Sequence, residues 1–304
     1  MKPHHTRSKR PSLQQRKPSR GSIFEALEAR IAPAAFTWIN PASGAWATAA
    51  NWSVVGVDAD GIPDADDDVT INPATVGLVV TISTGTQTAN TIAVPGIDVL
   101  AITGGTLTIS AASTVSNLTL SGGTLNAGPQ LTLTGTSAFS GNPTINGTVR
   151  NDDTLSIAGD PNLAGTLDNA GTMTNSGRFD FSGAGRLNNL AGATYEATTA
   201  NASILSGTTT EGFYNAGTFR ASPTGTATVS SLFHNLAGGT IDLTAGTLAL
   251  HSNGTWTGAN FLVSPGALVT LNAGSKTWEG TYTGTGGGIV RLGAGIQGAS
   301  SGGN

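Results

Sequence analysis

The pattern that decides the fold, Gly104-Gly105-Thr106-Leu107-Thr108-Ile109, returns as Gly122-Gly123-Thr124-Leu125, 18 residues further along the chain. In each copy, two glycines precede a run in which polar and apolar residues alternate. Alternation with a period of two is typical of a strand with one buried face. Glycine readily adopts the left-handed backbone conformation that a sharp corner between strands requires. The pattern therefore predicts short strands joined by tight corners.

A second pattern, Asn-x-Gly or Asn-x-x-Gly, recurs later in the chain. The interval from Asn169 to Asn189 equals the interval from Asn215 to Asn235, and a further copy begins at Asn175. The repeated interval is about 20 residues, which with short strands is the period of one coil of a parallel β-helix. Identical corners on successive coils stack their asparagine side chains, so we expect a hydrogen-bonded ladder.

The sequence thus predicts an all-β protein, a right-handed parallel β-helix (β-solenoid), with coils of roughly 18–24 residues from about residue 69 to 292. A β-sandwich also has many short strands, but it does not give near-identical corner motifs at a fixed spacing. We expect a disordered basic leader with a short helix at 1–34, a Trp-rich capping module at 35–100 and β-solenoid repeats at 101–304. Only 11% of the residues are charged and 43 are glycine, which agrees with this fold class.

The composition excludes several classes of protein. The chain has no cysteine, which excludes a disulfide scaffold, cysteine zinc sites and thiol catalysis. It has no apolar run long enough to predict a transmembrane helix. Residues 1–34 carry eight basic and two acidic side chains, whereas the rest carries six basic and sixteen acidic ones. Because no aromatic residue precedes Phe24 and the acidic body offers no basic face, we predict no nucleic-acid binding.

The end of the basic leader has the features of a short amphipathic helix. Ser22 and Glu25 match a capping box, and apolar residues recur every four positions from Ile23 to Ile31. Pro33 ends the helix. A helix of about ten residues is marginal alone in water, so we expect it to fold against a partner or a membrane surface.

The stretch Phe-Glu-Ala-Leu-Glu-Ala-Arg-Ile at residues 24–31, after a Lys/Arg-rich start, resembles the LEPR-XLL N-terminal region of large bacterial surface and secreted proteins. The matching positions, which form the implied sorting motif, are Leu27, Glu28 and Arg30. Ala29 stands where that family has proline. The resemblance implies export or sorting machinery as a partner and an extracellular or cell-surface location in a bacterium. The alternative is an accidental capped helix.

Three tryptophans, Trp38, Trp46 and Trp52, lie close together in the sequence. They have two interpretations: rings that close the apolar end of a solenoid, or an exposed platform on which sugars stack. The order Trp, Gly, Trp, Asn-Trp-Ser, Pro and Asp-Asp-Val-Thr-Ile over residues 38–71 resembles the opening module of bacterial autotransporter-passenger and surface β-helix proteins. The resemblance implies a module that begins the solenoid and has no chemistry of its own.

Residues 58–68 hold six aspartates and no basic residue. Calcium takes oxygens from acids at alternating positions, which makes Asp58, Asp60, Asp64 and Asp66 candidate ligands. The stretch is similar to the loops of thrombospondin type 3 and dockerin-like repeats, but it lacks the third acid and the closing glutamate of an EF-hand. A calcium site and a solvated acidic loop both remain open, and the sequence requires no other cofactor.

The repeat body offers few candidates for catalysis. His234 and His251 are separated by nearly one coil length, so they are candidates for a metal pair on neighbouring coils or for surface residues. Arg150 beside Asp152 and Asp153 predicts a turn, because adjacent strand residues face opposite sides. We therefore predict a secreted or cell-surface structural or adhesive repeat protein that is not an enzyme. The alternative is a polysaccharide-binding or polysaccharide-cleaving β-helix, with surface glycans as partners.

Overall fold

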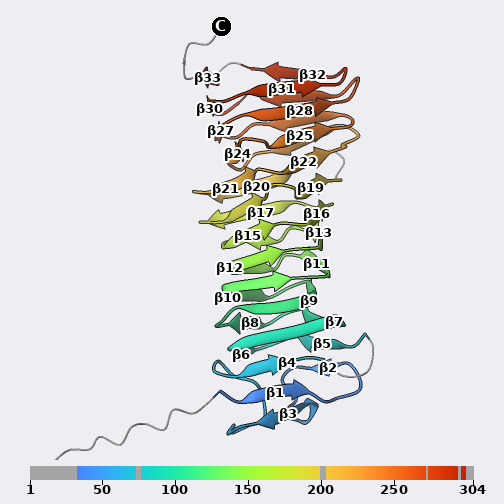
Figure 1. The fold of residues 1–304 in the computed structure, drawn as a ribbon, viewed down its shortest axis with the longest axis vertical. Helices are drawn as coiled ribbons and strands as arrows, with labels where there is room; N and C mark the ends of the chain where they lie inside the picture. Colours follow the sequence, from blue (N-terminus) through green and yellow to red (C-terminus); the bar gives the residue numbers. More distant parts are fainter. Residues whose placement is uncertain (1–32, 73–76, 199–202, 272, 294–295, 299–304) are drawn as a thin grey trace, which may run out of the picture. The chain divides into compact units, whose positions relative to one another are not determined.

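The computed structural model describes residues 33–72, 77–198, 203–271, 273–293 and 296–298. In the unit formed by residues 32–304, parallel strands stack coil upon coil into a β-solenoid of about 11 turns (Figure 1). The predicted all-β, parallel solenoid is therefore confirmed. The only helix among the described residues is the short 3-10 helix η1 (Ala49–Asn51), and none of their helices is long and apolar enough to cross a membrane. The predicted leader helix lies outside the described residues.

Each coil after the first contributes a strand to each of three parallel sheets, and the longest strands bend from one sheet into the next. Sheet I contains β1 (Ala35–Trp38), β4 (Asp68–Thr70), the first parts of β7 (Thr91–Ile102) and β9 (Ser113–Leu120), the second parts of β10 (Thr124–Leu133) and β12 (Thr144–Asn151), β15 (Thr166–Asn169), β18 (Arg186–Asn189), β21 (Gly212–Asn215), β24 (Phe233–Asn235), β27 (Gly254–Trp256), β30 (Lys276–Trp278) and β33 (Ile296–Gly298).

Sheets II and III complete the coils. Sheet II contains β2 (Gly44–Ala45), β5 (Val79–Ile82), the second parts of β7 and β9, β11 (Thr136–Gly141), β13 (Thr154–Gly159), β16 (Thr172–Asn175), β19 (Thr194–Ala197), β22 (Thr218–Ala221), β25 (Thr240–Leu243), β28 (Ala259–Val263) and β31 (Tyr282–Thr285). Sheet III contains β6 (Thr86–Ala89), β8 (Thr106–Ile109), the first parts of β10 and β12, β14 (Asn162–Leu163), β17 (Phe179–Gly183), β20 (Ser203–Thr209), β23 (Thr226–Val229), β26 (Thr247–Leu250), β29 (Leu268–Leu271) and β32 (Ile289–Leu292).

Coil length follows from the separation of residues that pair in neighbouring strands. It is 18 residues between Asn151 and Asn169, and it is 26 residues between Asn189 and Asn215. The predicted range therefore holds for most coils and is exceeded next to β20. Parallel pairing already begins where β1 meets β4. The solenoid thus starts within the capping module rather than after it.

The core lies between the three sheets. Strand residues alternate between inward and outward positions, as in β8, where Leu107 and Ile109 are buried. The core residues from Val69 to Leu133 are all aliphatic, whereas aromatic rings join the aliphatic side chains from Phe139 onward. The rings of Phe213 and Phe233 stack with centroids 5.2 Å apart and an interplanar angle of 3°. The Phe213 ring therefore covers the Phe233 ring of the next coil. Each buried side chain of this kind stabilises the fold by about 1.5–3 kcal/mol relative to exposure.

Buried asparagines form the predicted ladder at the corner between sheet I and sheet II. Each ends a sheet I strand and has no solvent exposure: Asn151, Asn169, Asn189, Asn215 and Asn235. Each of the first four donates a hydrogen bond from Nδ2 to Oδ1 of the next, at 2.8 or 2.9 Å. The same nitrogens donate to backbone carbonyls of sheet II, as from Asn189 to Thr218 at 3.0 Å. The ladder thus satisfies its buried amide groups, apart from Asn151 Oδ1 at its start, and fixes how successive coils align.

The three clustered tryptophans lie inside the first coil. Trp38 and Trp46 are at most 1% exposed and Trp52 is 6% exposed. The Trp52 ring packs edge-on against Trp38 and Trp46, with centroid distances of 4.9 and 5.1 Å. β3 (Trp52–Val55) pairs antiparallel with β1, at the end of the column opposite β32 (Figure 1). The indoles have the position that capping requires, and the sugar-platform interpretation is wrong because their faces are buried.

Candidate functional site

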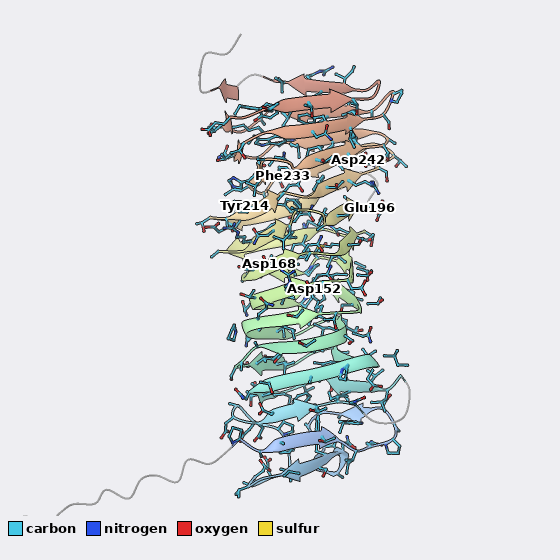
Figure 2. The ribbon with its side chains drawn as sticks, in the orientation of Figure 1. Asp152, Asp168, Glu196, Tyr214, Phe233 and Asp242 are labelled. Atoms are coloured by element: carbon cyan, nitrogen blue, oxygen red, sulfur yellow. The ribbon has the colours of Figure 1, made fainter. Side chains whose placement is uncertain are left out.

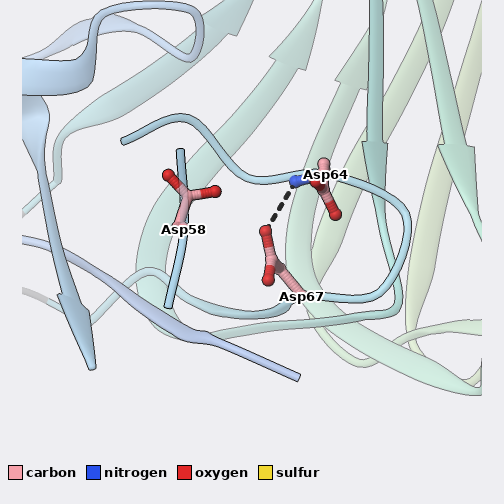
Figure 3. Close-up of side chains that lie close together, drawn as sticks. All are labelled: Asp58, Asp64 and Asp67. Atoms are coloured by element: carbon pink, nitrogen blue, oxygen red, sulfur yellow. Dashed lines mark hydrogen bonds between the residues drawn. The ribbon is translucent and has the colours of Figure 1, made fainter. Parts of the chain in front are cut away.

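Three aspartates of the acidic loop converge in front of the first coils (Figure 3). Carboxylate oxygens of Asp58, Asp64 and Asp67 all lie within 4.8 Å of one another. Among the described residues this is the only group of three or more potential metal ligands of this kind. Asp58 and Asp64 were predicted as ligands. Asp60 and Asp66, the other two predicted ligands, are not part of the group.

Backbone amides fold this acidic loop around its own carboxylates. Asp67 accepts hydrogen bonds from the backbone N–H of Ala34 at 3.1 Å and of Asp64 at 2.9 Å. Asp58 accepts from the N–H groups of Asp60 and Gly61. Because a carboxylate has about four lone-pair sites, these bonds leave acceptor capacity for a cation. Asp67 is the member of this group that the sequence did not predict, because its place beside Asp68 matched the capping-module pattern.

Proton affinities in the loop reflect the crowding of like charges. A side-chain hydrogen bond with Asp66 is the main cause that raises the pKa of Asp64 above its usual value. Burial is the main cause that raises the pKa of Asp67, and Asp64 and Asp58 add to it. Groups with raised pKa hold protons more tightly in the folded state, so their contribution to stability increases as the pH falls toward those pKa values. A bound divalent cation would oppose this protonation.

The predicted sorting residues are not part of the described structure. Leu27, Glu28 and Arg30 lie within residues 1–32, outside the described ranges.

Arginines on the outer faces of the coils are paired with acids. Each pair is exposed or partly exposed: Arg150 with Asp152 at 2.6 Å, Arg178 with Asp180 at 2.7 Å and Asp160 at 3.3 Å, Arg186 with Glu211 at 3.2 Å, and Arg220 with Asp242 at 2.8 Å. Arg150 and Asp152 meet at a bend after β12, as predicted. Because carboxylates already neutralise these guanidinium groups, the four arginines are poorly suited to hold the carboxylates of an acidic polysaccharide.

The outer face of sheet I carries a polar row along successive coils. Asp168, Asn188, Tyr214 and His234 are in register on β15, β18, β21 and β24. Figure 2 shows Asp168 and Tyr214 on the same side of the column. The Tyr214 ring stacks on the His234 ring at a centroid distance of 4.3 Å. The Arg186 guanidinium lies 3.9 Å from the centroid of the Tyr214 ring. Both faces of this ring are therefore in use within the protein.

The two histidines of the repeat body have different surroundings. His234 accepts a hydrogen bond at Nδ1 from the backbone N–H of Thr255 at 3.1 Å, and burial lowers its pKa. His251 is exposed at the corner after β26. Neither belongs to a group of three potential metal ligands among the residues described. The histidine pair therefore has the surroundings of surface and corner residues.

Comparison with protein-family models, with curated proteins and with solved structures gives no match to this chain.

Proposed function

We propose that this chain is a structural or adhesive repeat protein of the bacterial cell surface or exterior, without chemistry of its own. The asparagine ladder carries the proposal. The asparagine side chains at the first four of its five positions bond to the same position of the next coil, and the rings of Phe213 and Phe233 stack in the core. A protein that uses its buried polar and aromatic groups for coil-to-coil contacts is suited to act as a stiff spacer.

The outer surface supports the same proposal. It carries few charges, and four arginines form pairs with acids. Exposed ion pairs of this kind contribute about 0–1 kcal/mol each, so they act on solubility more than on stability. A sparsely charged, hydroxyl-rich exterior suits contact with surface glycans.

Export is the part of the proposal that depends on the leader. We expect residues 1–34 to direct a fused reporter out of the cytoplasm of a bacterial host that sorts LEPR-XLL proteins. Replacing Leu27, Glu28 and Arg30 together by alanine should retain the reporter inside, because these are the positions that match the sorting motif. Protease accessibility on intact cells measures the outcome. A reporter with the unaltered leader that stays wholly cytoplasmic contradicts the proposal.

Calcium is the cofactor that fits the acidic loop within this proposal. Three carboxylates within 4.8 Å of one another supply hard oxygen ligands, and Gly61 adopts the positive φ of 75° that the bend needs. Extracellular calcium modules bind with dissociation constants of about 10⁻⁴–10⁻³ M. About 10 mM calcium should therefore stabilise the folded chain by about 1–3 kcal/mol through mass action.

Thermal melting of the full chain tests this calcium prediction. We expect a higher Tm in calcium than in chelator, and we expect Asp58→Asn combined with Asp64→Asn to abolish the difference. Asp60→Asn is the matched control, because Asp60 is outside the convergent group. Identical melting curves in calcium and in chelator would leave the solvated-loop interpretation.

A further inference from the structure

A groove of about 330 Å³ lies at the corner between sheet III and sheet I and extends over three successive coils. Its lining comes from the end of β20 and from the turns after β23 and β26, and includes Thr208, Thr209, Ser231, His251, Ser252 and Asn253. The volume is near the lower end of the range of small-ligand pockets, about 300–1,000 Å³. The groove is open on one side, as a site that binds one segment of a long polymer must be.

The groove exists because β20 is longer than the strand that stacks on it. Gly207, Thr208 and Thr209 pair with β17 on one side. On the other side, the pairing with β23 ends at Leu205 and Val229. The last residues of β20 therefore form a short sheet edge above the turns of the next two coils. This edge adds backbone donors and acceptors to the side chains of the groove.

Two serines that line the groove have hydroxyls that are closed to solvent and have no hydrogen-bond partner within the protein. Ser231 is 2% exposed and Ser252 is 6% exposed, and neither Oγ contacts a donor or acceptor. Buried polar groups are satisfied in the great majority of cases, so two such groups in one wall call for an explanation. A serine hydroxyl changes partner by rotating between staggered χ1 positions. Such a rotation would turn either hydroxyl from the closed interior toward the groove, where a ligand would supply the partner that the protein does not.

We propose that this groove binds a segment of a neutral polysaccharide. Its lining residues are threonine, serine, glycine, leucine, histidine and asparagine, without an acidic residue, a lysine or an arginine. Such a lining has no permanently charged side chain to balance a phosphate, a uronate or a metal ion. Its hydroxyl, amide and imidazole groups donate and accept hydrogen bonds, as sugar hydroxyls do. The sheet edge is only a few residues long, which disfavours an added peptide strand. This site specifies the class of ligand for the proposed adhesive role. It rests on the proposed function only in that the glycan would be met at the cell surface or exterior.

Glycan-array screening of the full chain, followed by calorimetric titration, tests the site. The probes are neutral hexasaccharides of glucose and of N-acetylglucosamine, with galacturonate hexasaccharide as the acidic comparison. We expect a neutral glycan to bind and galacturonate not to bind. Ser231→Ala combined with Ser252→Ala should weaken binding at least tenfold and leave the Tm unchanged or higher, because each hydroxyl removed is unpartnered in the free protein.

Ser137→Ala is the matched control. Ser137 is also buried at 1% exposure, but its Oγ accepts a hydrogen bond from the backbone N–H of Leu118 at 3.0 Å. We expect this variant to lower the Tm and to bind the glycan as the unaltered chain does. The proposal is overturned if no neutral glycan on the array binds, if galacturonate binds instead, or if the double variant binds as before. Export of the reporter is unaffected by any of these results, so the two proposals fail separately.

Discussion

Replacing Asn189 by alanine is expected to destabilise the solenoid by about 3–5 kcal/mol. The substitution removes the bonds from Asn189 Nδ2 to Asn215 Oδ1 and to the Thr218 carbonyl, and it takes away the acceptor of Asn169 Nδ2. These partners stay buried, and each unsatisfied buried group costs about 1–3 kcal/mol. Urea denaturation measures the overall loss, and hydrogen exchange should show faster opening of the coils on either side of Asn189.

The neighbouring residue provides a control for the ladder. Asn188 faces outward and donates from Nδ2 to Asp168 at 2.6 Å on the partly exposed side of the strand. Asn188→Ala should therefore cost less than about 1 kcal/mol. If Asn189→Ala costs no more than Asn188→Ala, the ladder is not a major source of stability.

Gly147→Ala is expected to separate two coils. Gly147 has a φ of 77°, and a Cβ atom added there would lie 1.5 Å from the carbonyl oxygen of Ala127 on the preceding coil. The backbone must move to relieve this overlap, which breaks the pairing of Ala127 with Gly147 in sheet III. The overlap adds to the cost of a left-handed conformation, which is about 1–2 kcal/mol. We therefore expect the free energy of unfolding to fall by about 4 kcal/mol or more. Denaturant midpoints and the yield of soluble protein measure it.

Gly192→Ala is the control that separates the cost of a left-handed backbone from the cost of atomic overlap. Gly192 also has a positive φ, 87°, but nothing lies within 4 Å of an added Cβ atom. This variant should lose only the conformational part, about 1–2 kcal/mol. Equal losses for the two glycine variants would contradict the close approach of coils at Gly147.

The repeated corner motifs predicted the coil and the ladder but not every member of it. Asn169, Asn189, Asn215 and Asn235 lie where their spacing predicted. Asn175 has the same local motif, yet its Nδ2 donates to the Tyr195 hydroxyl at 2.7 Å, at a different corner of the coil. Local sequence shows that a corner is present but not which of the corners it is. Asn151 was missed for the opposite reason, because Asp153 and Thr154 occupy the positions where the motif has glycine.

The candidate sites were less predictable because they depend on side chains from separate segments. Asp58 and Asp64 were identified from charge density, whereas Asp67 joins them only after the loop folds back on β1 through Ala34. Ser231 and Ser252 gave no signal in a chain rich in serine and threonine. Their position in one wall follows from the excess length of β20, which no local pattern encodes.

The central claim is that the coils stack in parallel at a regular spacing. Distances between pairs of spin labels test this claim most directly. The chain has no cysteine, so labels on introduced cysteines are unambiguous. Thr119 and Glu196 occupy the same outward column of sheet II four coils apart, and Thr119 and Leu262 are seven coils apart. At about 4.8 Å per coil, the stacked structure predicts backbone separations of about 19 and 34 Å. Distances that do not increase in proportion to the number of coils would contradict the parallel solenoid.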